Sequence, residues 1–589
     1  MELIQHIKNF FPSTQRSKIT GFETLKLNYS SDGSLKNLTE TFGWPPNLFI
    51  ILYTLLDYTD KYRLLVAPQS HFKWDDKLKL EAENAATEWN YFLEKEKLPN
   101  KSNIKIHLNN IFKSINMKKC IYDLLNQTEF CQSTFILVLS IDNVFRAKNI
   151  RRNELSDITP AEVASNMRAF MHMINSEGSL NLDLDLDNQG KDINLADNNT
   201  KYGFIAYKGL VPQSGLTINN LCQNLTYLKP NVAPEIIYSF DADNKFDSSS
   251  YNVLFIPWPL KVEDESFKIS SIRPIETNRF FDFFDYEPNE PIFNEVMRMV
   301  RSAIISTIKR LGSIDLIVFP ECAFSTKTFN KLKEKIYEHF GEDAPSILSG
   351  VYGKDEDGGI NTASLAFTGI GDGYDTINQK KHHRWYLDRD QIRAYNLAAR
   401  LDPGKKWWEN IDISRRKLAV LTTPDGIKLC PLVCEDLARQ EPVAQAVRAI
   451  GPNFVVSLLL DGPQLKARWP GKYATVLSDD PGSSVLTVTP LGMTLKSTGL
   501  GDPPSRVVAL WSEQGKSAEE ISIGEDGIGI ALELKVEKTT NWSLFGTKQE
   551  KIILKKMFHS TIIDQYKDSN SNNLRTVLEK LLKDGGYNI

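Results

Sequence analysis

Apolar residues recur at helical spacing in the first third of the chain. Leucine and isoleucine at positions 48, 51, 52, 55 and 56 share one helical face behind the proline pair 45–46, and proline is tolerated in a first helical turn. Residues 78–97 are rich in Glu, Ala, Lys and Leu, which favour helix. Thr159 and Glu162 have capping-box spacing. These patterns predict a mainly helical N-terminal domain over residues 1–180, without any catalytic spacing.

The helical pattern stops at an acidic stretch. Aspartates alternate with leucines after residue 180, and more Asn and Asp follow. Alternating aspartates resemble a calcium loop, but Asn188 and Asn194 stand where such a loop needs glycine and glutamate. The composition therefore predicts a mobile acidic loop and connecting segment over 181–249, with a strand at 203–208.

From residue 250 the pattern changes to short continuous apolar runs separated by helical stretches. The runs are at 253–257, 314–319, 427–433, 454–460 and 484–489. Runs of this length are typical of strands buried on both faces. Helices are expected at 296–311 and 329–336, paired strands at 346–351 and 361–367, and a long loop after 257. This alternation predicts an α/β layered domain with a mixed sheet over 250–560, followed by an amphipathic helical tail over 561–589.

Composition narrows the class of protein. The chain has 589 residues, of which 41% are hydrophobic and 24% charged, as in soluble multidomain proteins. A net charge of −4 lacks the overall basic character that is typical of nucleic-acid-binding proteins. Six cysteines in so long a chain favour a reducing compartment over a disulfide framework. No apolar run approaches the ~20 residues of a membrane span, and the N-terminus does not resemble a signal peptide. We therefore predict a cytoplasmic protein with no membrane partner.

Three polar residues follow predicted strands of the second part, where sites form in open α/β sheets. Glu321 follows the run 316–320, Lys381 lies in a basic segment, and Cys434 ends the run 427–433. A strand that ends on Cys434 and turns sharply into a helix would expose the sulfur to the positive end of that helix.

Together these residues form a working set for amide chemistry. A thiol needs a base to become a nucleophilic thiolate, and a carboxylate can accept that proton. Attack on a carbonyl or nitrile carbon builds negative charge, which a fixed ammonium group stabilises. Cys430, Cys434, His382 and His383 do not have the spacing of a tetrahedral zinc set. No metal or other cofactor is predicted.

The order and surroundings of the three residues resemble the carbon–nitrogen hydrolase (nitrilase) superfamily. Residues 318–321 resemble its hydrophobic-Pro-Glu motif, Lys381 with His383 resembles its Lys-x-His motif, and Cys434 with Asp436 resembles its Cys-x-Asp motif. Residues 361–363 resemble the strand that precedes the family's lysine. The resemblance covers residues 250–535 and leaves the N-terminal part out.

The resemblance implies a four-layer α-β-β-α sandwich and a Glu-Lys-Cys triad. Glu321 would be the general base, Lys381 the oxyanion-stabilising residue and Cys434 the nucleophile, with the main chain of Glu435 lining the site. Lys380 with His382 also fits the lysine motif, so both lysines stay open. A second acid that orients the lysine in many members has two candidates here, Asp388 and Asp390.

The implied reaction is hydrolysis of a small-molecule amide or nitrile through a thioacyl-enzyme. Transfer of the acyl group to an amine is an alternative, and so is an assembly or sensing role that needs no catalysis. The long N-terminal extension resembles members associated with reverse transcriptases in bacterial anti-phage defence, although this chain has no polymerase motif. The resemblance also implies a homo-oligomer and a defence-system protein partner.

Overall fold

The described residues form two compact units. The computed structural model of the chain describes residues 1–12, 29–31, 33, 41–67, 71–145, 159–161, 163–165, 194–213, 215–238, 249–355, 358–368, 373–414, 416–423, 425–567 and 570–584. The first unit comprises residues 1–237, 446–451 and 539–551, and the second comprises 238–445, 452–538 and 552–589. Residues 181–193 of the acidic loop and connecting segment predicted over 181–249 lie outside the described residues, as does most of the helix predicted after Thr159.

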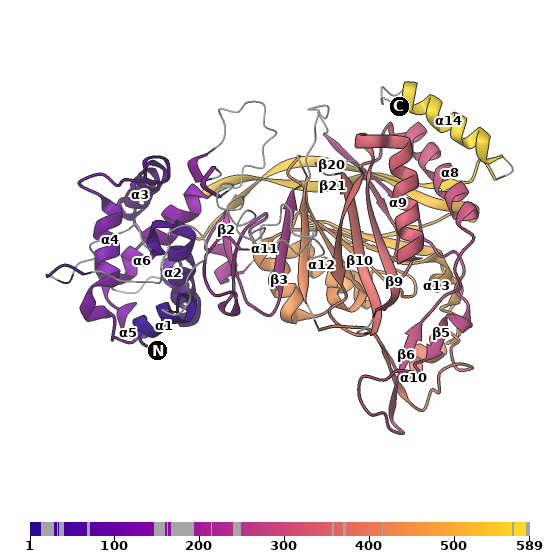
Figure 1. Cartoon of the computed structure of the whole chain (residues 1–589), viewed down its shortest axis with the longest axis horizontal. Helices are drawn as coiled ribbons and strands as arrows, with labels where there is room; N and C mark the ends of the chain where they lie inside the picture. Colours follow the sequence, from indigo (N-terminus) through magenta and orange to yellow (C-terminus); the bar gives the residue numbers. More distant parts are fainter. Residues whose placement is uncertain are drawn as a thin grey trace, which may run out of the picture. The chain divides into compact units, whose positions relative to one another are not determined.

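The first unit is mainly helical, as the apolar spacing predicts (Figure 1). Its helices are α1 (Leu3–Phe10), α2 (Pro45–Thr59), α3 (Asp76–Lys95), α4 (Asn103–Phe112), α5 (Ile121–Leu124) and α6 (Thr128–Val144). Nearly every residue of α2 and α6 is buried, so apolar residues occupy all their faces. Within the described part of the chain, no helix combines the length and apolar character that crossing a membrane requires.

A buried aspartate in α6 fixes a strand pair of the first unit. Strands β1 (Phe204–Tyr207) and β2 (Leu225–Leu228) are antiparallel, and β3 (Ala233–Tyr238) follows. The Asp142 carboxylate accepts backbone N–H groups of Gln223, Asn224 and Leu225 at 2.9, 2.9 and 2.7 Å. Burial raises the pKa of Asp142, and these three donors oppose the rise. The carboxylate thus holds the start of β2 to the helix.

The first sheet of the second unit is mixed. Its order is β11-β10-β9-β7-β4-β20-β21, with β8 beside β9. The central strands β4, β7 and β9 are parallel, and the outer ones antiparallel. The strands are β4 (Ser250–Phe255), β7 (Leu316–Val318), β8 (Phe324–Ser325), β9 (Ser346–Asp355), β10 (Gly358–Thr368), β11 (Tyr374–Lys380), β20 (Gly527–Trp542) and β21 (Lys548–Ile563).

The second sheet lies against the first. Its strands in this unit run β19-β18-β17-β16-β15-β14, and β15, β16 and β17 are parallel. They are β14 (Lys417–Thr422), β15 (Lys428–Val433), β16 (Phe454–Leu458), β17 (Ser484–Val488), β18 (Val507–Ser512) and β19 (Glu519–Ser522). Strands β10 and β11 contact β15 and β14, so the two sheets form adjacent layers.

Helices cover the outer face of each sheet, which confirms the predicted α-β-β-α layering (Figure 1). Helices α8 (Phe293–Leu311) and α9 (Thr326–Phe340) contact β4 and β9, while α12 (Trp469–Asp479) contacts β17 and β18. Short helices α10 (Arg389–Ala394), α11 (Gln445–Ile450) and α13 (Leu491–Lys496) lie between strands in the sequence. The C-terminal helix α14 (Ser571–Asp584) packs on α8 through buried Leu574, Leu578 and Leu582.

A third, small sheet takes two of its strands from the long loop predicted after residue 257, and the rest of that stretch is mainly irregular. Its order is β12-β13-β6-β5, formed by β12 (Tyr386–Leu387), β13 (Lys406–Glu409), β6 (Phe281–Tyr286) and β5 (Phe267–Ile269). The prediction missed β6 because two aspartates interrupt its aromatic run. Both are buried and paired with basic side chains, Asp282 with Arg273 at 2.8 Å and Asp285 with Lys354 at 3.4 Å.

Candidate active site

Glu321 lies just beyond the carboxyl end of β7 in a tight backbone turn. The next residue, Cys322, has a left-handed φ of 52°, and the Glu321 side chain is buried. Strand β9 passes so close that a Cβ on Gly350 would lie 2.4 Å from the Glu321 Cα and from the Cys322 nitrogen. Only glycine fits at this point, and its close approach holds the Glu321 backbone in place.

Lys381 contacts Glu321 directly. Its Nζ lies 2.8 Å from Glu321 Oε1, and both side chains are almost fully buried. The alternative lysine, Lys380, points elsewhere: its Nζ pairs with Asp412 at 2.6 Å, and its side chain is 31% exposed. Since successive residues at a strand end point to opposite faces, only one of the two adjacent lysines can reach Glu321.

A second acid, Glu409 at the end of β13, completes the network. Its Oε2 lies 2.7 Å from Lys381 Nζ and accepts the Trp385 N–H at 3.0 Å. Asn361 bridges the two acids, because its Nδ2 donates to Glu321 Oε1 at 2.8 Å and to Glu409 Oε1 at 2.7 Å. Glu409 lies in β13, a strand that the sequence patterns do not predict, so its place was missed. The one pattern that could have indicated it is an acid directly after the apolar pair 407–408.

The acids predicted to support the lysine lie elsewhere. Asp388 accepts the backbone N–H groups of Asp390 and Gln391 at 2.9 Å and caps α10. Asp390 is exposed in the first turn of that helix. The prediction of Asp388 or Asp390 is therefore corrected to Glu409. Proximity in sequence to the lysine was misleading, because Asp388 begins a helix where a capping side chain is needed.

The remaining oxygen of Glu321 is held by the second sheet. Its Oε2 accepts the Leu460 N–H at 2.6 Å, just past the end of β16. Burial raises the pKa of Glu321 and Glu409 adds to the rise, whereas Lys381 and its hydrogen bond oppose it. Burial alone would lower the pKa of Lys381, but the two carboxylates raise it well above its usual value. Lys381 is therefore the ammonium form.

Cys434 follows β15 in a strained turn. Its φ is 47°, a left-handed conformation rare outside glycine, and its side chain is 2% exposed. Residues Cys434–Leu437 form a short 3₁₀ turn, and α11 starts only at Gln445. The predicted stabilisation of a thiolate by an adjacent helix is thus wrong. Burial raises the pKa of Cys434 well above its usual value and Glu321 adds to this, while Lys381 lowers it. These effects favour the neutral thiol over a preformed thiolate.

Asp436 joins the cysteine turn to the lysine segment. Its carboxylate accepts the backbone N–H of His382 at 3.0 and 3.1 Å and lies 2.9 Å from His383 Nδ1. His383 thus contacts the cysteine turn through Asp436. The Glu435 side chain is directed to Arg439, at 2.8 Å, and the main-chain role that the resemblance implies for Glu435 stays a prediction.

The hydroxyl of Tyr286 is buried beside the site and makes no hydrogen bond within the described residues. Tyr286 is the last residue of β6 and packs on the apolar cluster that contains Cys322, Trp385 and Leu460. Its ring centroid lies 6.3 Å from that of Tyr352. Burial raises the pKa of Tyr286, and the nearby Cys322, Tyr352 and Glu321 add to the rise. A buried polar group without a partner needs an explanation.

The residues that carry this chemistry are acids, a lysine and thiols. Across the described ranges, no group of three or more His, Cys, Asp and Glu side chains is arranged to hold a metal ion. All six cysteines are free thiols.

Comparisons with known proteins give structural matches only. No protein-family model matches the sequence, and no curated protein matches it. Among solved structures, an amidase from Nesterenkonia sp. is similar at 11% identity and a TM-score of 0.27, covering 57% of this chain and 99% of that one. Nit3 of Saccharomyces cerevisiae, a nitrilase superfamily member, matches at 13% and 0.25, covering 57% and 94%. The CN-hydrolase superfamily protein XC1258 from Xanthomonas campestris matches at 14% and 0.25, covering 57% and 97%.

Proposed function

We propose that the chain is a cysteine-dependent hydrolase of non-peptide carbon–nitrogen bonds, with an amide or nitrile as substrate. The observation that supports this most is the closed network of Glu321, Lys381 and Glu409 beside the buried Cys434 thiol. Acyl transfer to a thiol requires a base, a fixed cation and a nucleophile in one enclosed place, and these side chains could supply all three.

For an amide substrate, Glu321 takes the proton from the Cys434 Sγ in the first step, and the sulfur attacks the carbonyl carbon. The carbonyl π electrons move to oxygen, and the Lys381 ammonium stabilises the charge that forms. When the intermediate collapses, the C–N bond breaks, and the amine leaves with the proton held by Glu321. The raised pKa values of Glu321 and Cys434 favour this coupled transfer over a preformed thiolate.

In the second step water attacks the thioester. Glu321 accepts a proton from the water as its oxygen bonds to the acyl carbon, and Lys381 again stabilises the oxyanion. The C–S bond then breaks, and the sulfur takes the proton back from Glu321. A carboxylic acid leaves, and each side chain returns to its starting form.

Trapping the thiol tests the proposal. The native protein is incubated with a small 2-fluoroacetamide or nitrile probe, digested and mapped by mass spectrometry. We expect one adduct per chain, on Cys434, although all six cysteines react with a thiol reagent after denaturation. Native protein without an adduct on Cys434, alongside a fully labelled denatured control, would count against the hydrolase.

The biological setting stays a prediction. A homo-oligomer, a defence-system partner such as a reverse transcriptase, and acyl transfer to an amine in place of water are all implied only by the resemblance of sequence motifs. Added amine acceptors in the same assay, with product analysis, separate hydrolysis from transfer.

Glu409→Gln should slow turnover and shift its pH dependence. The amide keeps the size of the side chain but removes one of two charges that hold Lys381. Misplacement of Lys381 is expected to lower kcat by about 10²-fold. Because Glu409 raises the pKa of Glu321, its neutralisation should also move the acid limb of the kcat/KM profile to lower pH. Asp388→Asn is the control: it should leave kcat and both limbs unchanged. An unshifted acid limb in Glu409→Gln would mean that Glu409 does not act on Glu321.

Tyr286→Phe should weaken substrate binding while stabilising the free protein. We propose that the unpartnered hydroxyl binds a polar group of the substrate, so its loss raises KM by roughly 2- to 12-fold, the worth of one hydrogen bond. In the free protein, removal of an unpaired buried hydroxyl should raise the melting temperature. Tyr395→Phe is the contrast, because the Tyr395 hydroxyl donates to buried Asp461, and its loss should destabilise the protein. An unchanged KM in Tyr286→Phe would remove Tyr286 from the substrate site.

A further inference from the structure

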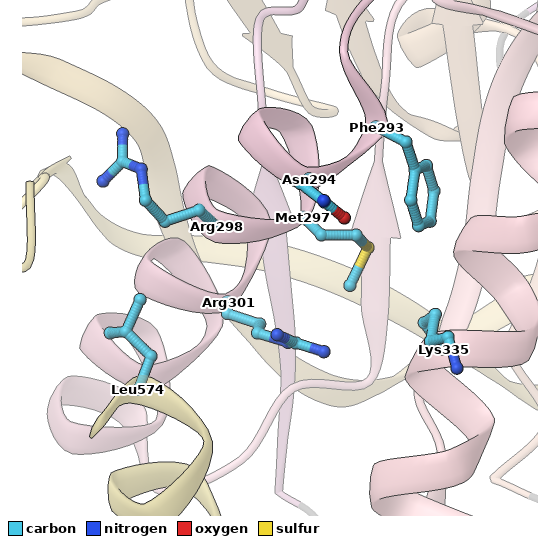
Figure 2. A pocket seen from close by; sticks show the side chains of 7 residues that line it. All are labelled: Phe293, Asn294, Met297, Arg298, Arg301, Lys335 and Leu574. Carbon is cyan, nitrogen blue, oxygen red and sulfur yellow. The ribbon is translucent and has the colours of Figure 1, made fainter. Parts of the chain in front are cut away.

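A pocket of about 220 Å³ lies among α8, α9 and α14, outside the candidate active site (Figure 2). Phe293, Met297 and Leu574 form its apolar wall, and Arg298, Arg301 and Lys335 are its basic side chains. The volume is below the roughly 300–1,000 Å³ of sites for drug-sized ligands, so the pocket suits a small ligand.

Arg301 extends across this pocket toward Lys335 of the neighbouring helix (Figure 2). Its Nε is buried and makes no hydrogen bond with any described residue. Burial lowers the pKa of Arg301, and the like charge of Arg575 adds to the effect, whereas Glu338 opposes it. A guanidinium nitrogen removed from water without a partner is costly, so the geometry favours a bound acceptor.

A second nitrogen without a hydrogen bond lies close enough to Arg301 for its charge to affect it. The Nε2 of His339, on α9, is buried and without a hydrogen bond among the described residues. Burial lowers the pKa of His339, and Arg301 and Arg575 lower it further, while Glu338 and Glu579 oppose them. Basic groups from three helices therefore converge at one place.

The acids nearby are already paired with other cations. Asp564 pairs with Arg298 at 2.8 Å and Glu579 with Arg575 at 2.8 Å. Glu338, the one acid among the electrostatic causes that act on Arg301, pairs with Lys335 at 2.6 Å. Its charge is thus shared between two cations. Arg298 points away from the pocket toward its acid, whereas Arg301 extends across it and brings a positive charge to the apolar wall (Figure 2).

We propose that this pocket binds a small organic anion, a phosphate or carboxylate group carried on a short apolar body. The anionic oxygens would accept from the Arg301 guanidinium in the paired geometry that arginine favours, and the body would cover Phe293, Met297 and Leu574. This site is independent of the proposed hydrolase.

Calorimetric titration of the full chain tests the site. The probes are phenyl phosphate, benzoate and neutral benzyl alcohol, which share a ring and differ in charge. We expect at least one of the two anions to bind, with an affinity that weakens as salt rises, and benzyl alcohol not to bind. Binding of phenyl phosphate without benzoate assigns a phosphate ligand, and the reverse assigns a carboxylate. Equal binding of benzyl alcohol, or no anion binding at low salt, overturns the proposal.

Matched variants separate this pocket from other sites. Arg301→Gln should weaken anion binding at least tenfold. Arg301→Lys should have an intermediate affinity, because lysine keeps the charge but lacks the paired N–H donors of the guanidinium. Arg310→Gln, an exposed position on the same helix, should bind as the unmodified protein does. Cys434→Ala should also bind normally, since a benzoate site at the candidate active site would respond to that change. If Arg301→Gln fails to fold, Arg301→Lys and Lys335→Gln decide the outcome: unchanged affinity in both refutes the pocket.

Discussion

Replacement of Lys381 by methionine is expected to destabilise the protein by about 3–5 kcal/mol, the cost of breaking a buried ion pair by removing one partner. The ammonium lies between Glu321 and Glu409 at 2.8 and 2.7 Å, and its side chain is completely buried. Without it, two carboxylates linked through Asn361 are left in an enclosed place with no counter-charge. One of them must take up a proton or the site must open, and in either case the oxyanion stabilisation proposed for Lys381 is lost.

Urea unfolding at pH 7, followed by circular dichroism, measures the loss of stability. Turnover of a small amide or nitrile substrate measures the loss of oxyanion stabilisation. Lys380→Met is the matched control. Its ammonium pairs with Asp412, and the lysine and aspartate side chains are 31% and 8% exposed, so we expect a smaller loss of about 1–2 kcal/mol and nearly normal turnover. Equal destabilisation by the two changes would contradict the assignment of Lys381 to the network.

A double change tests whether the destabilisation is electrostatic. In Lys381→Met with Glu409→Gln, one of the two stranded charges is gone. The double variant should therefore be more stable than Lys381→Met alone, although it stays inactive. Strictly additive losses would indicate that packing, rather than the uncompensated carboxylates, determines the stability of this site.

The sequence predicts best those elements and residues whose structure depends on the spacing of side chains within one short segment. Helices α8 and α9 and strands β7, β15 and β16 occur where apolar periodicity places them, because burial on one or both faces is recorded in the spacing of side chains. Glu321 and Cys434 could be proposed for a related reason: each directly follows a buried strand, and strand ends bring distant residues to one sheet edge.

The rest of the site depends on contacts between distant segments. Glu409 reaches Lys381 because β13 pairs with β6, and the pairing of two segments more than 100 residues apart leaves no periodic pattern in either. Asn361 could be matched to a motif, but its bridging of two acids needs their positions. Tyr286 was missed with the strand that carries it. The raised pKa of Cys434 also could not be predicted, since it follows from burial and from Glu321, not from the local turn.

The charges of this network affect two thiols, so the choice of nucleophile needs a direct test. Glu321 and Lys381 both act on Cys434, and they also act on Cys322, together with Glu409. Cys430 is buried in β15, the strand that leads to Cys434, and burial is the only cause that raises the pKa of Cys430. The three cysteines thus form a graded set: one at the strand-end turn, one near the same charges, and one away from them.

Cys434→Ala is expected to reduce turnover by roughly 10⁴-fold or more, as loss of a nucleophile does in enzymes with a covalent intermediate, and to abolish the probe adduct. Alanine at this position keeps the left-handed backbone and removes one buried atom, so the free energy of unfolding should change by only about 1 kcal/mol. Cys430→Ala should retain both turnover and the adduct. Cys322→Ala should retain the adduct on Cys434, since the Cys322 side chain packs in an apolar cluster with Trp385 and Leu460.

An adduct that persists in Cys434→Ala and disappears in Cys322→Ala would assign the nucleophile to Cys322 instead. Full biological activity in a folded Cys434→Ala protein would instead favour the assembly or sensing role, because such a role needs the fold but not the thiol.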